Sequence, residues 1–178
     1  WLIIWPTLNN LNLQTRPSSS IDGFAYIFNL TTKQTTKILG PVAGLNSLLS
    51  PDGKKVIYSS SQNGQIKTYL KTISKESEDE LSIKTLIDKC IWYDTKYIIC
   101  AVPNNYPTTN YPDTWYQGLI FFNDRDIWLI DANKLESYSI SIFGKSLADE
   151  PIDAINLKIS PDGKTLYFIN KIDSSLWS

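Results

Sequence analysis

The chain carries Leu48-Leu-Ser-Pro-Asp-Gly-Lys-Lys-Val-Ile-Tyr-Ser59 and later repeats the pattern as Lys158-Ile-Ser-Pro-Asp-Gly-Lys-Thr-Leu-Tyr-Phe-Ile169. Each stretch runs from an apolar segment through a polar turn into a second apolar segment. In the turn, proline presets φ, Asp52 or Asp162 is able to bond the backbone, and Gly53 or Gly163 accepts the positive φ that other residues resist. The repeat therefore predicts two β-hairpins of the same design.

Two weaker copies of this hairpin occur elsewhere in the chain. One is Cys90-Ile-Trp-Tyr-Asp-Thr-Lys-Tyr-Ile-Ile-Cys100, with Asp94 in the turn, and the other lies at residues 2–13, with Asn10 in the turn. Asn10, Asp52 and Asp94 follow one another at intervals of 42 residues. This interval lies within the ~40–45 residues of a four-stranded propeller blade. The distance from Asp94 to Asp162 is 68 residues, which indicates an insertion.

Further strand patterns follow each hairpin. Third strands are expected at residues 26–30, 67–71, 127–131 and 176–177, and outer strands at 35–39, 81–86 and 138–143. The prediction is an all-β fold, a β-propeller of four-stranded antiparallel blades, in a single segment with blades at about residues 1–40, 41–86, 87–143 and 144–178. The last blade is incomplete, so about three and a half blades are present. Because propellers close with ~4–8 blades, we expect the intact protein to have six to eight.

The Ser-Pro-Asp-Gly-Lys turn followed by an apolar strand resembles the repeat of TolB-like propellers, the WD40-like PD40 repeat. This resemblance covers essentially the whole chain. Residues 90–105 and 153–163 are also similar to uncharacterised bacterial proteins that carry such repeats behind a membrane anchor. The resemblance implies a fold and an extracytoplasmic location, periplasmic or at the cell surface, but no particular activity.

Composition excludes several function classes. Among the 178 residues, 17 Lys and Arg stand against 18 Asp and Glu, so the net charge of −1 gives no field for attracting nucleic acid. The absence of His removes Ser-His-Asp catalysis and His-ligated zinc. No apolar run reaches the ~20 residues that span a bilayer, so membrane contact is expected only through a segment outside these residues. No metal or other cofactor is expected.

The insertion at residues 103–124 is rich in aromatic side chains among polar residues. Tyr106, Tyr111, Trp115 and Tyr116, with Asp113 beside them, are typical of a surface that binds sugars or peptides. The alternative is a loop that packs its own rings over the blade. A second connection, residues 144–153, is expected on the same face of the disc.

Other carboxylates lie in or near these insertions, at Asp124, Asp126, Asp149, Glu150 and Asp153. Their spacing matches no calcium-binding loop, so we expect them on the solvated surface. The mixed-charge run at residues 75–80 is similarly expected to be a solvated turn.

Cys90 and Cys100 flank the turn at Asp94 symmetrically. A hairpin with a loop at residues 94–96 sets them opposite each other, where the Cα atoms of a non-hydrogen-bonded pair lie ~4.5 Å apart and a disulfide is possible. A disulfide would indicate an extracytoplasmic location. The alternative is two buried free thiols.

The expected function is non-catalytic binding or scaffolding, with an unidentified protein or glycan partner and a monomeric chain. The competing hypothesis is the propeller of a larger enzyme, either a prolyl-oligopeptidase-like hydrolase or a polysaccharide lyase, whose catalytic residues lie outside this chain. A third possibility is a purely structural spacer.

Overall fold

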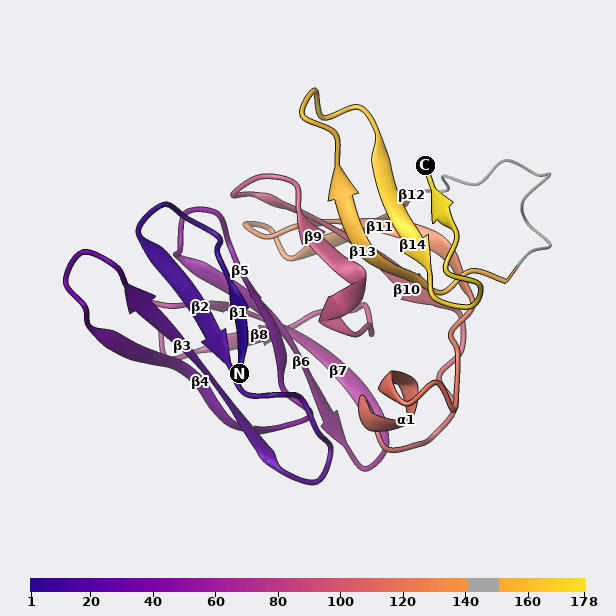
Figure 1. Cartoon of the computed structure of the whole chain (residues 1–178), viewed down its shortest axis with the longest axis horizontal. Coiled ribbons are helices and arrows are strands. Elements are labelled where there is room, and N and C mark those ends of the chain that lie inside the picture. The colour runs from indigo at the N-terminus through magenta and orange to yellow at the C-terminus, as the bar shows by residue number, and fades with distance from the viewer. Residues whose placement is uncertain (141–150) are drawn as a thin grey trace.

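The computed structural model describes residues 1–140 and 151–178, and these residues form four antiparallel sheets arranged in a fan (Figure 1). The predicted all-β propeller architecture is confirmed. The first blade contains β1 (Leu2–Ile4), β2 (Asn10–Gln14), β3 (Asp22–Asn29) and β4 (Thr35–Ala43). The second contains β5 (Asn46–Leu49), β6 (Lys55–Gln62), β7 (Gln65–Thr72) and β8 (Glu78–Glu80). The third contains β9 (Cys90–Trp92), β10 (Tyr97–Pro103), β11 (Asp124–Asp131) and β12 (Glu136–Ile140), and the fourth contains β13 (Ala154–Ile159), β14 (Leu166–Asn170) and β15 (Leu176–Trp177).

Within each blade, the strands follow one another from the axis outward in chain order. The innermost strands β1, β5, β9 and β13 line a common axial groove. Within residues 1–140 and 151–178, two short helices interrupt the pattern, the 3-10 helix η1 (Ile87–Lys89) before β9 and the helix α1 (Asp113–Tyr116) between β10 and β11. Both helices belong to the third blade, which also carries the sequence insertion.

The two Ser-Pro-Asp-Gly turns have the same hydrogen bonds. Asp52 Oδ1 accepts bonds from Ser50 Oγ at 2.7 Å and from the backbone N of Lys54 at 3.1 Å. Asp162 Oδ1 accepts the corresponding bonds from Ser160 Oγ and the backbone N of Lys164. Gly53 and Gly163 have φ values of 71° and 72°. In the weaker copy, Asp94 Oδ1 accepts bonds from two backbone N–H groups of its own turn.

Apolar side chains between neighbouring blades form the core. Leu39 and Leu45 pack with Tyr58 between the first two blades, and Ile57 and Ile130 belong to the cluster between the second and third. A third cluster joins the third blade to the fourth. Because each blade buries its faces against its neighbours, the inner strands are held rigidly around the axis.

The outer strand of the second blade differs from the prediction. Residues 81–86 were expected to form it, but β8 lies at Glu78–Glu80, within the run expected to be a solvated turn. Leu81, Ile83 and Leu86 are instead buried between blades. Burial of these side chains removes them from the sheet edge, and the acidic strand that replaces them suits an exposed edge. In the third blade, β12 ends at Ile140, and the rest of the predicted strand lies outside the described residues.

A disulfide joins Cys90 to Cys100 across β9 and β10. The two residues are register partners, and their Cα atoms lie 4.1 Å apart. Both side chains are buried in the core between the second and third blades. The bond therefore ties the innermost strand of the third blade to its neighbour.

Replacing both cysteines with alanine is expected to lower the free energy of unfolding by about 3 kcal/mol, because the bond closes a loop of about ten residues in the unfolded chain. Urea denaturation measures the change. A reductant should lower the midpoint of the wild-type chain and leave that of C90A/C100A unchanged. Equal midpoints for the oxidised and reduced wild-type chain would contradict this prediction.

Candidate functional site

The axial groove is the cavity that the innermost strands of all four blades share. It has a volume of about 380 Å³. Its wall combines apolar and polar side chains, from Leu2, Ile3, Ile4, Gln14, Asn46, Ser47, Leu48, Ile87, Asp88, Cys90, Ile91, Asn156, Leu157 and Lys158. A concave site with an apolar wall and a few polar groups is typical of ligand-binding sites.

A chain of hydrogen-bonded polar side chains crosses the wall of this groove. Gln14 Oε1 accepts bonds from the backbone N and the Oγ of Ser47, and Gln14 Nε2 donates to Asn46 Oδ1 at 3.2 Å. Asn46 Nδ2 donates to Asp88 Oδ2. Tyr116 Oη donates to the same Asp88 oxygen at 2.8 Å and lies 3.1 Å from Asn46 Nδ2. This series of hydrogen bonds thus connects the first two blades with η1 and α1.

Asp88 is the acidic end of this chain. Its side chain is half-buried, and burial raises the pKa of its carboxyl above the ordinary value of an aspartate, although the bonds from Tyr116 and Asn46 oppose that effect. Burial and the adjacent Asp88 carboxylate also raise the pKa of the Tyr116 phenol. Tyr116 is therefore a neutral hydrogen-bond donor to Asp88.

A buried ion cluster lies next to Asp88, around Lys89. Lys89 Nζ lies 2.7 Å from Asp124 Oδ2 and 2.5 Å from Asp153 Oδ1, and all three side chains are fully buried. Lys89 Nζ also donates to the backbone O of Ala154 at 3.0 Å. A buried cation needs such compensation, because transferring it from water without partners costs several kcal/mol.

The two carboxylates of the cluster also bind neighbouring groups. Asp153 Oδ2 accepts bonds from Trp115 Nε1 at 2.7 Å and from the backbone N of Phe122 at 3.1 Å. Asp124 Oδ2 accepts one from the backbone N of Ala154 at 2.8 Å, whereas its buried Oδ1 has no hydrogen-bond partner among the residues that the structure describes. Burial accordingly raises the pKa of Asp124, against the opposing effect of Lys89.

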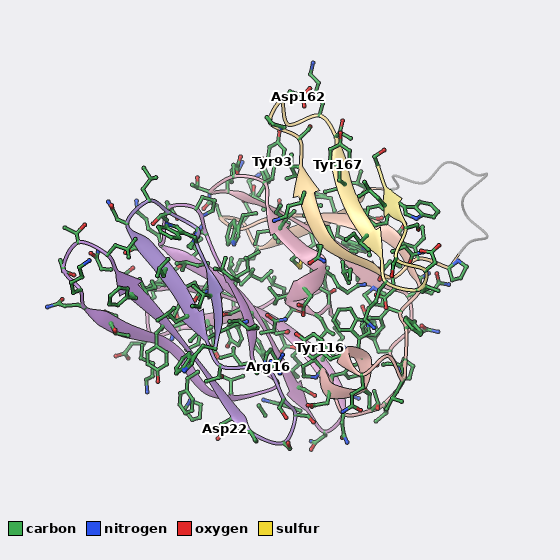
Figure 2. All side chains as sticks on the ribbon, in the orientation of Figure 1. Arg16, Asp22, Tyr93, Tyr116, Asp162 and Tyr167 are labelled. Atoms are coloured by element: carbon green, nitrogen blue, oxygen red, sulfur yellow. A yellow bond between two sulfur atoms is a disulfide. The ribbon has the colours of Figure 1, made fainter. Side chains whose placement is uncertain are left out.

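The ion cluster and the groove are linked through two pairs of consecutive residues. Lys89 and Trp115 both bind Asp153, while their neighbours Asp88 and Tyr116 bind each other. The two contacts to Asp153 are buried, whereas Asp88 lines the groove. Figure 2 shows Tyr116, the last residue of α1, near the centre of the molecule. The ion cluster therefore holds η1 and α1 in the positions that bring Asp88 and Tyr116 together.

Two of the carboxylates expected on the surface are in this cluster. The prediction for Asp124 and Asp153 is wrong, because Lys89 compensates their charge and allows burial. Asp126 is half-buried, and Asp149 and Glu150 lie outside the described residues. Sequence reasoning missed Lys89 because it is an ordinary lysine before a strand. The signal available in the sequence was that Lys89 directly precedes the core residue Cys90, and this signal is too weak to predict a buried lysine.

The aromatic insertion does not present its rings as one exposed surface. Tyr111 is fully buried and Trp115 is 2% exposed, and both pack with Phe122 in a core cluster, against which the half-buried Tyr106 also packs. The alternative, a loop that packs its own rings, describes these residues. Tyr116 remains 41% exposed.

Asp113 stands at the start of α1 and has a contact with the first blade. Its Oδ2 accepts a hydrogen bond of 2.6 Å from the backbone N of Ser19. The bond connects the insertion to the loop between β2 and β3. Among the predicted ligand-binding residues, Tyr116 thus bonds to the groove residue Asp88, and Asp113 has a bridging contact.

Among the described residues, no cluster of three or more His, Cys, Asp or Glu side chains is arranged to hold a metal ion. No helix in that part of the chain is long and apolar enough to cross a membrane.

Comparison with known proteins shows the fold. Similar solved structures include TolB from Acinetobacter baumannii, with a TM-score of 0.59 and 16% identity over 96% of this chain and 38% of that one. A putative TolB from Agrobacterium tumefaciens has a TM-score of 0.58 and 17% identity, over 94% and 52% of the two chains. The tricorn protease has a TM-score of 0.57 and 11% identity, over 93% and 14%.

These structures share a β-propeller fold with the chain, and the chain spans about half or less of each. No family model matches the sequence. No curated protein matches it either. The fold is thus TolB-like, as the repeat implies, and the function has to be argued from the site.

Proposed function

We propose that the chain is a non-catalytic binding domain whose ligand, part of a protein or a glycan, occupies the axial groove. The observation that carries the proposal is the row of hydrogen-bonded side chains of Gln14, Asn46 and Asp88 on the groove wall. Tyr116 bonds to Asp88, and the buried ion cluster supports both residues. Buried ion clusters contribute little net stability, so their value is often in fixing a geometry. Here the fixed geometry is that of Asp88 and Tyr116.

We further propose that the chain works outside the cytoplasm and forms part of a larger propeller. The Cys90–Cys100 disulfide supports the location, since structural disulfides persist in oxidising compartments. The larger propeller is supported by the TolB structures, because the chain matches only 38% and 52% of their lengths.

A binding screen with site mapping tests the proposal. The chain would be screened against peptides, glycans and cell-envelope extracts, and each binder titrated into the ¹⁵N-labelled protein. We expect shifts in the backbone NMR signals of Ser47, Ile91 and Leu157, which line the groove on three different blades. Signals of Glu76 and Tyr138, exposed near the rim, should not move. Shifts confined to the rim, or no binder at all, would contradict the proposal.

The match to the tricorn protease favours a second candidate, the propeller part of a peptidase. In that case the intact protein would hydrolyse peptides and the 178-residue chain alone would not. A peptidase assay on both forms separates the two candidates.

A further inference from the structure

We propose that Asp88 is the anchor for an ammonium group of the ligand, so that the axial groove selects ligands bearing a primary amine next to an apolar group. This inference rests on the proposed binding function of the groove and adds the chemistry of the ligand. It is argued from the charges around Asp88, from its remaining hydrogen-bonding capacity and from the apolar wall beside it.

The corner of the groove around Asp88 has an excess of negative charge. The nearest cation in sequence is Lys89, but its ammonium is shared by the buried carboxylates of Asp124 and Asp153. Lys171 lies over the ring of Trp115 and donates to its backbone O at 2.8 Å, which places one further cation behind this corner. Among the described residues, and apart from the exposed Lys158 on the groove wall, the carboxylates of Asp88, Asp124 and Asp153 stand against the ammonium groups of Lys89 and Lys171. A cation in the groove would balance the remaining negative charge.

Asp88 keeps acceptor capacity for such a cation. Its two side-chain hydrogen bonds, from Asn46 and Tyr116, are both accepted by Oδ2. An ionised carboxylate accepts about four hydrogen bonds, so positions remain for a charged donor. Burial raises the pKa of this carboxyl, and a bound ammonium group would oppose that shift by favouring the ionised form.

An ammonium group fits these surroundings better than a metal ion. Metal ions require several protein ligands, and the described residues hold no cluster of three. A primary ammonium has three donors on one small charged group, and a single carboxylate with neighbouring amide oxygens satisfies it. Lys158, the other charged side chain among the described lining residues, is exposed and its charge is screened by solvent.

The rest of the wall indicates what the ammonium is attached to. Ile87 and Ile91 flank Asp88 on η1 and β9, and Leu2 and Leu48 line the groove from the first two blades. An aliphatic group beside the ammonium would bury its surface against these side chains. A peptide N-terminus with an apolar first residue and a lysine side chain both have this chemistry.

Simple amines provide the first test. Butylammonium and butanol, which differ chiefly in charge, would be titrated into the ¹⁵N-labelled chain while the signals of Asn46 and Ile91 are followed. We expect butylammonium to bind at least about tenfold more tightly than butanol, the minimum effect of a charge-assisted hydrogen bond. Equal affinities would overturn the proposal. This comparison uses the unchanged chain, so it does not depend on the folding of a variant.

A matched pair of variants then assigns the effect to Asp88. The isosteric D88N removes the charge in the groove, whereas E76Q removes the same charge from an exposed loop between β7 and β8. D88N should weaken butylammonium binding about tenfold or more and leave butanol binding unchanged, and E76Q should change neither. Equal losses in both variants would indicate a general charge effect and overturn the assignment.

Two short peptides distinguish the possible sources of the amine. Leucyl-leucinamide offers a free N-terminus, and N-acetyl-leucyl-lysinamide offers only the lysine ammonium. We expect at least one of them to bind in the groove with the same dependence on Asp88. If ligands from the screen shift the groove signals but neither amines nor these peptides do, the ammonium proposal fails while the binding function stands. If groove signals respond to no ligand of any kind, both fail.

Discussion

Replacing Lys89 with methionine is expected to lower the free energy of unfolding by about 3–5 kcal/mol, the effect of removing one partner of a buried ion cluster. Methionine keeps much of the side-chain volume, so the loss arises mainly from the charges left behind. Asp124 and Asp153 would remain fully buried without their cation. Urea denaturation followed by circular dichroism measures the change.

The control for K89M is K67M, which removes a lysine from the exposed pair with Glu80. Its effect should stay within about 1 kcal/mol, as for other surface ion pairs. An equal loss for the two variants would show that the buried cluster has no special role. A K89M variant as stable as the wild type would lead to the same conclusion.

The pH dependence of K89M offers a further check on the cause. Burial already raises the pKa of Asp124, and removal of the Lys89 ammonium should raise it more. The folded variant then binds protons more readily than the unfolded chain, so its stability relative to wild type should recover as the pH falls. A difference between K89M and wild type that is constant from pH 8 to pH 5 would point to lost packing instead.

Replacing Trp115 with alanine is expected to cost about 3–5 kcal/mol, the usual range for deleting a buried aromatic side chain. The ring is 2% exposed, packs near Tyr116 and Phe122, and donates to Asp153 Oδ2. Its loss leaves a cavity beside the ion cluster and removes one of the donors to Asp153. Urea denaturation again measures the change.

Two further variants separate the parts of this effect. W115F keeps an aromatic ring and loses the indole N–H, so it should cost about 1–3 kcal/mol, the penalty for an unsatisfied buried acceptor. W5A removes a tryptophan that is 66% exposed and should change stability by no more than about 0.5 kcal/mol. If W115A lowered the free energy of unfolding no more than W5A, the buried ring of Trp115 would not anchor the insertion. That result would contradict the inference that the ion cluster positions Tyr116.

Local sequence was sufficient to predict the repeated hairpins. In each Ser-Pro-Asp-Gly turn, the bonds join residues within five positions of one another, and glycine adopts the positive φ that the turn requires. The cross-strand placement of Cys90 and Cys100 follows in the same way from symmetry about one turn. Such features depend on neighbours in the chain, so their residue types identify them.

Strand patterns alone were insufficient where an apolar segment can either form a strand or pack between blades. The segment at residues 81–86 has the composition of an outer strand, yet Leu81 and Ile83 are buried between blades and acidic residues form the edge. The aromatic insertion is a similar case, because Tyr111 and Trp115 suit a binding surface as well as a core. Only the packing partners decide between such alternatives.

The blade architecture could thus be predicted from the repeat interval in the sequence, and the turns and the possible disulfide from the stereochemistry of short hairpins. The tertiary structure alone decided that Lys89, Asp124 and Asp153 meet in the core and that Asp88 and Tyr116 meet at the groove. The physical reason is that burial of a charge depends on a partner of opposite sign within a few ångströms. The partners here come from η1, α1, β11 and the residue before β13, which only the folded blades bring together.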